Sequence, residues 1–91
     1  MRFIAVHAVA FPEDQLAPLT REPMPEGVAW RHTFIAYGDA KTYCHWEAPS
    51  RQALTDLFVK YQVPVEAIHE VREFDPVTGR LEPEGKVAVP V

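Results

Sequence analysis

The chain has 91 residues, of which 47% are hydrophobic and 24% charged, and its formal net charge is −4. These values are typical of one small globular domain over residues 1–91, with a core in residues 1–75 and a C-terminal extension in residues 76–91. The acidic balance argues against nucleic-acid binding, which needs a clustered basic surface. No apolar run is long enough to span a membrane, and the single cysteine fits a reducing, cytoplasmic location.

Strand and helix patterns alternate along the chain in the order β-α-β-β-α-β. The strands are predicted over residues 2–10, 28–37, 40–48 and 66–74, and the helices over residues 13–19 and 51–61. Because Pro18 removes a backbone hydrogen bond, the first helix is expected to be short or distorted. Ser50 is a good N-cap for the second helix. A turn at residues 75–79 then leads to an apolar tail, residues 86–91, which either docks as an added strand or is disordered.

The best-marked turn of the sequence is Tyr37-Gly38-Asp39-Ala40. With Gly38-Asp39 as a two-residue loop of type II′, counting back along both strands sets His32 opposite His45. A four-residue loop would shift the register by two and set His32 against Glu47, but the same residues would still share one face. A three-residue loop would instead swap the two faces of the hairpin.

This order of elements predicts an α+β ferredoxin-like sandwich with an antiparallel four-stranded sheet, of the type that forms dimeric α/β barrels. Both helices cover one sheet face in this fold, and Cys44 is expected there as an unreactive core residue. The other face is left bare and is expected to carry aromatic and histidine side chains: Phe3, His7, Trp30, His32, Phe34, Tyr43 and His45. So much exposed aromatic surface predicts a homodimer formed sheet to sheet.

The segment A-K-T-Y-C-H-W-E-A-P, residues 40–49, resembles the signature D-K-T-Y-C-x-Y-E-A-P of a family of small bacterial domains of unknown function. The family's later pattern, P-x-x-x-I-x-E-V, is filled by Pro64, Ile68, Glu70 and Val71. A tryptophan is also common in the family at the position of Trp30. The resemblance spans residues 28–75 and implies a dimeric ferredoxin-like fold.

The same family includes a nickel-binding protein, so the resemblance also implies nickel binding. That relative has histidines at the positions of His7 and His32, whereas a further histidine of its pattern is replaced here by Ala29. The first helix is also shorter and richer in proline in this chain.

Four histidines, each on a different predicted strand, are the main candidates for chemistry: His7, His32, His45 and His69. Because neighbouring strands lie about 4.8 Å apart, all four cannot reach one ion, and His69 is expected to approach only His7. We expect His32 with His45 or His7, and Glu47 as an oxygen ligand, to form a site for nickel, zinc or copper.

Two alternatives stay open. The histidines can simply pack at the dimer interface, or the protein can be a cofactor-free small oxygenase or isomerase. Such enzymes use a cleft between the sheet and the helices, and a histidine with Tyr43 or Glu47 would act there as an acid–base pair. This alternative predicts a closed apolar pocket beside His45 and Tyr43. Neither a catalytic triad nor a nucleophile elbow nor a phosphate loop is visible in the sequence, so the substrate and the catalytic residues stay unassigned.

Overall fold

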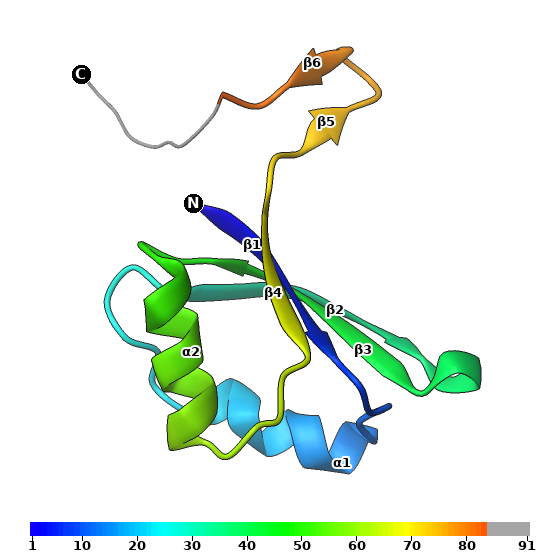
Figure 1. Ribbon diagram of the computed structural model, residues 1–91, viewed down its shortest axis with the longest axis vertical. Coiled ribbons are helices and arrows are strands. Elements are labelled where there is room, and N and C mark those ends of the chain that lie inside the picture. The colour runs from blue at the N-terminus through cyan, green and yellow to red at the C-terminus, as the bar shows by residue number, and fades with distance from the viewer. Residues whose placement is uncertain (84–91) are drawn as a thin grey trace.

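The elements of the fold are taken from a computed structural model that describes residues 1–83 (Figure 1). The strands of its main sheet are β1 (Arg2–His7), β2 (Ala29–Ala36), β3 (Lys41–Glu47) and β4 (Ala67–Val71). The helices are α1 (Glu13–Leu16), the 3₁₀ segments η1 (Ala17–Arg21) and η2 (Tyr37–Asp39), and α2 (Arg51–Lys60). Two short strands, β5 (Phe74–Asp75) and β6 (Arg80–Leu81), form a separate ribbon. The tail predicted over residues 86–91 lies outside the described residues.

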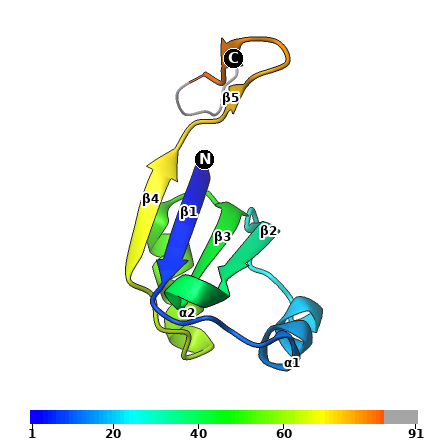
Figure 2. The same ribbon diagram turned by 90° about the vertical axis from the view of Figure 1, so that its right-hand side faces the viewer.

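The main sheet is antiparallel, with the strand order β2-β3-β1-β4 (Figure 2). Helix α2 packs on one face, and α1 with η1 lies on that same side, as Figure 1 shows. The predicted order of strands and helices and the α+β ferredoxin-like class are therefore confirmed. Within residues 1–83, no helix has the length and apolar character needed to cross a membrane.

The helices form where local sequence favours them. Ser50 caps α2, because its Oγ accepts a hydrogen bond from the backbone N–H of Ala53 at 3.1 Å. The first helical segment changes from α to 3₁₀ geometry at Ala17, directly before Pro18, as the missing backbone donor predicts.

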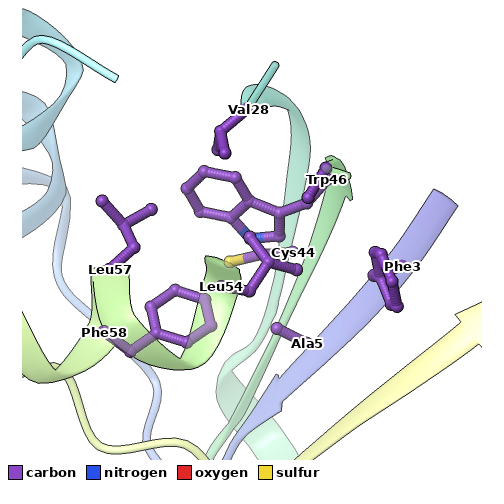
Figure 3. Close-up of a cluster of buried hydrophobic side chains, with 9 residues drawn as sticks. Phe3, Ala5, Val28, Cys44, Trp46, Leu54, Leu57 and Phe58 are labelled. Atoms are coloured by element: carbon purple, nitrogen blue, oxygen red, sulfur yellow. The ribbon is translucent and has the colours of Figure 1, made fainter. Parts of the chain in front are cut away.

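The core lies between α2 and the covered face of the sheet (Figure 3). It consists of nine buried residues: Phe3, Ala5, Val28, Cys44, Trp46, Ala48, Leu54, Leu57 and Phe58. The prediction that Phe3 and His7 belong to the bare face is wrong, because each is only 1% exposed on the helix side. Both faces of β1 are apolar, so the alternation could not select the inner one, and the core takes the face with the large Phe3 ring. Ile4 and Val6, both half-buried, lie on the open face instead.

The hairpin of β2 and β3 has the predicted register at its histidines, since His32 pairs with His45 and Phe34 with Tyr43. One extra residue, Arg31, forms a bulge between Trp30 and His32. The residues of β2 that precede the bulge therefore face the opposite side of the sheet from the side that the predicted alternation gave them. Trp30 is therefore not on the bare face as predicted. It packs against the core, and its ring stacks on that of Trp46 with centroids 5.4 Å apart.

The loop of this hairpin differs from the predicted two-residue type II′ turn. Ala36 and Lys41 form the last pair of the ladder, so four residues connect the strands. The expectation that a four-residue loop sets His32 against Glu47 is wrong, because this loop is centred on the same bond as the predicted one and preserves its register. The left-handed position is occupied by Ala40, with φ +55°, and not by Gly38. An L-residue in this region is strained, because its Cβ approaches the following carbonyl.

The loop geometry predicts that two opposite substitutions both stabilise the protein. Ala40→Gly should raise the free energy of unfolding by roughly 0.5–1 kcal/mol, because it removes the strain of a left-handed alanine. Gly38→Ala should raise it by about 0.4–1 kcal/mol, because its φ is not positive and an added Cβ would meet no atom within 4 Å. Chemical denaturation measures both changes.

The matched control is Gly79→Ala, the same substitution at a residue with φ +72°, which should destabilise the protein. A loss of stability in both loop variants would instead indicate the two-residue type II′ turn.

The core assignment of Cys44 predicts an unreactive thiol. Its side chain is 4% exposed and accepts a hydrogen bond from Thr33 Oγ1 at 3.3 Å, and burial raises the pKa of the thiol. Because the thiolate is the reactive species, a thiol reagent should label native protein slowly and unfolded protein quickly. Fast labelling of the native state would show that this face of β3 is open.

Candidate functional site

Two histidines meet on the open face of the sheet. His32 and His45 face each other across β2 and β3, their ring centroids are 5.5 Å apart, and the ring planes differ by 23°. His32 is exposed and His45 half-buried. The predicted cross-strand alignment of these two side chains is confirmed, so two imidazoles are available on a surface that the helices leave uncovered.

An arginine from the neighbouring strand contacts this pair. Arg2 Nη1 lies 2.7 Å from His45 Nε2. A guanidinium can only donate, so Nε2 accepts and the ring proton lies on Nδ1. The pKa of His45 is lowered by burial first, and then by the positive charges of Arg2 and of His32. His45 is thereby held in the neutral form, which is the form that binds metals.

Arg2 also fastens the C-terminal ribbon to the sheet. Its Nε donates to Glu82 Oε1 at 2.7 Å, and its Nη2 lies 3.6 Å from Glu73 Oε1. The hydrogen bond from Arg2 lowers the pKa of Glu82. Figure 1 shows the β5–β6 ribbon projecting past the end of the sheet, next to the N-terminus where β1 begins. The residues after β4 thus contribute two carboxylates to the surroundings of His45.

An ion pair between Glu47 and the bulged residue Arg31 also borders the histidine pair. Arg31 Nη2 donates to Glu47 Oε1 at 2.9 Å, and this hydrogen bond lowers the pKa of the carboxylate. These groups surround an open hollow of about 480 Å³, which is lined by Arg2, Ile4, Arg31, His32, Phe34, His45, Glu47, Val71 and Glu73. Glu47 therefore lies beside the histidines as predicted, but its Oε1 already accepts a hydrogen bond from Arg31.

The other two histidines do not join this pair. His7 lies on the helix side, where its Nδ1 is 2.7 Å from the carbonyl oxygen of Pro64. His69 pairs with Ile4 and is separated from His45 by the whole width of β1. The expected approach of His69 to His7 is wrong, because the two side chains lie on opposite faces. In one chain, His7 cannot share an ion with His32 and His45.

A single chain supplies an incomplete ligand set in this arrangement. Among residues 1–83, no three side chains of histidine, cysteine, aspartate or glutamate form a group that could hold a metal ion. The cross-strand pair offers two nitrogen ligands, and Glu47 could add a third only by leaving Arg31.

The enzyme alternative placed a closed apolar pocket beside His45 and Tyr43, and this placement is wrong. Both side chains lie on the open face, where Tyr43 is 37% exposed. An apolar pocket lies behind the sheet instead, between the sheet and the helices, where it borders His7.

Sequence reasoning missed the charged residues around the histidine pair. Nothing in the pattern of β2 signals the bulge that turns Arg31 toward Glu47. Arg2 was missed because the sequence did not show which face of β1 is turned toward the core. Its partner Glu82 was missed because it lies 80 positions from Arg2 in the sequence.

Comparison with known proteins gives one family match. Residues 6–71 match the family model described as "Nickel responsive protein SCO4226-like". This match confirms the resemblance to a family that includes a nickel-related protein, and it covers well over half of the chain. The matched region contains both open-face histidines and Glu47, but neither Arg2 nor the carboxylates that hold it. No curated protein and no solved structure gave a significant match.

Proposed function

We propose a metal-binding function for this chain, which belongs to the family of nickel responsive proteins described as SCO4226-like. The metal is a divalent transition ion, with nickel as the first candidate, and its ligands are His32 and His45. The observation that carries the proposal is the stacked cross-strand pair on an uncovered sheet face. Imidazole nitrogen suits nickel, copper and zinc, and a carboxylate beside it extends the same ligand set.

The protonation of the pair supports this function. Burial and the charge of Arg2 keep His45 neutral, and its Nε2 lone pair is used only in the hydrogen bond from Arg2. A metal ion that takes this lone pair displaces one guanidinium hydrogen bond. Arg2 then keeps its contacts with Glu82 and Glu73, so its charge is not left unpaired. Displacement of the arginine is thus compatible with the rest of the site.

Glu47 is the proposed oxygen ligand. It must exchange Arg31 for the ion, and exposed ion pairs of this kind contribute little to stability. Arg31 and Glu47 both border the same hollow as the two histidines. The proposed change of partner is a rotation of the Glu47 side chain within that hollow.

A second copy of the chain is proposed to complete the coordination. The open face carries Phe34, which is 66% exposed, together with Tyr43 and the half-buried Ile4 and Val6. Pairing two sheets face to face would bury this apolar surface, as in a dimeric α/β barrel, and would bring a second histidine pair toward the first. Four imidazoles can then surround one ion that a single pair cannot enclose.

Metal titration tests the site directly. Calorimetry with Ni²⁺, Zn²⁺ and Cu²⁺ should show binding at micromolar Kd or tighter, corresponding to about −8 kcal/mol. His32→Ala should weaken it at least about tenfold, because one of two imidazole ligands is lost.

Arg2→Gln should tighten metal binding, because a competing hydrogen-bond donor and a like charge leave the site. Affinity should fall as the pH drops below about 6.5, the pKa of free imidazole, and because the pKa of His45 is lowered, its own loss of affinity comes below that value.

The matched control is His69→Ala, which removes an exposed histidine on the far side of β1. Its affinity should equal that of the unmodified protein. The proposal fails if none of the three ions binds, or if His32→Ala and His69→Ala bind equally well.

The dimer is tested by light scattering on Phe34→Asp. The unmodified protein should have twice the mass of one chain, and the variant should dissociate, because an unpaired carboxylate is costly to bury at the interface. The control is Val59→Asp, which places the same charge on an exposed position of α2, 73% accessible and away from the sheet. A monomeric unmodified protein at high concentration would contradict the proposal, as would equal dissociation of both variants.

A further inference from the structure

A second candidate site lies behind the sheet, on the face opposite the histidine pair. A cavity of about 40 Å³ lies between the sheet, α2 and the α1–η1 segment. Its sheet side is formed by His7, Trp30, Cys44 and Trp46, and its α2 side by Leu57 and Phe58. Figure 3 shows Cys44, Trp46, Leu57 and Phe58 converging in this part of the core. Cavities with such apolar walls take up small apolar molecules.

His7 supplies a hydrogen-bond acceptor to this apolar space. Its Nδ1 lies 2.7 Å from the carbonyl oxygen of Pro64, so Nδ1 carries the proton and donates it. Burial lowers the pKa of His7, which keeps the ring neutral. Nε2 therefore has a free lone pair, and no hydrogen bond to it is found within residues 1–83. The rings of Phe11 and Phe58 pack on it in T-shaped contacts, with centroids 5.5 and 5.3 Å away.

Trp46 supplies the complementary donor. Its side chain is 4% exposed, and among the described residues Nε1 is a buried polar atom without a hydrogen-bond partner. A buried donor left unpaired costs about 1–3 kcal/mol. The neighbouring Trp30 lacks this cost, because its Nε1 donates to Thr33 Oγ1 at 2.6 Å. A ligand oxygen at Trp46 would supply the missing acceptor.

The wall facing α1 and η1 is lightly packed. These segments have no buried residue, and they contribute the half-buried Leu16 and Leu19. A second hollow, of about 160 Å³, is lined by the same two leucines together with Phe11, Tyr61 and Val63. Leu16 and Leu19 therefore border free space in both pockets. Their movement can enlarge the cavity without disturbing the sheet.

We propose that this cavity binds a small, largely apolar molecule with one hydroxyl group, of which a phenol is the simplest form. The hydroxyl hydrogen is donated to His7 Nε2, and the hydroxyl oxygen accepts from Trp46 Nε1. The apolar ring lies among the side chains of Leu16, Leu19 and Phe58. This site is independent of the proposed metal site, since none of its residues is a metal ligand.

The test uses phenol and toluene as probes, added to metal-free, full-length protein and followed by NMR of the tryptophan indole N–H signals. Phenol should shift the Trp46 signal, whereas the Trp30 signal, whose donor is already paired, should stay nearly fixed. In His7→Phe, the ratio of phenol affinity to toluene affinity should fall at least about tenfold, because the hydroxyl loses its acceptor. His69→Phe, the same change on the open face, should leave the ratio unchanged.

A second variant keeps the test valid if His7→Phe does not fold. Leu19→Trp should fill the cavity and abolish the binding of both probes, while the dispersion of the backbone amide signals shows that the fold is intact. The proposal is overturned if phenol leaves the Trp46 signal unchanged. It is also overturned if the affinity ratio in folded His7→Phe equals that of the unmodified protein, or if folded Leu19→Trp still binds phenol.

Discussion

The burial of one face of β1 determines the positions of the functional groups in this molecule. β1 is a central strand, paired with β3 on one side and β4 on the other. Because side chains alternate along a strand, placing Phe3 in the core also places His7 there and turns Arg2 and Ile4 outward. The same choice brings Arg2 to His45 and leaves His7 beside the apolar cavity behind the sheet. If the other face of β1 were buried, Arg2 would face the core and His7 the open side of the sheet.

Charge balance around the histidine pair depends on the same choice. Two arginines, Arg2 and Arg31, contact one histidine and one carboxylate of the open face. The positive charge of Arg2 is compensated by Glu73 and Glu82. The result is a neutral imidazole in a half-buried position, next to partners that can be exchanged. Such an arrangement keeps His45 unprotonated, and its Nε2 stays accessible from the open face.

The sequence allowed the element order and the pairing of His32 with His45 to be predicted. The pairing was correct although the turn type was wrong, because the real four-residue loop is centred on the same bond as the predicted one. The sequence could not show which face of β1 is buried, because apolar residues occupy both of its faces. The bulge at Arg31 left no mark in composition, so the inward position of Trp30 was missed as well.

The site residues were harder to predict than the fold, since they depend on contacts between distant segments. Glu82 reaches Arg2 from the C-terminal ribbon, a region that pattern alone could not place. The alternation of β3 shows how closely the two candidate sites lie. His45 faces the open hollow, while its neighbours Cys44 and Trp46 face the cavity behind the sheet. One strand therefore carries polar contacts on one face and apolar walls on the other, so that the two candidate sites lie back to back on the same sheet.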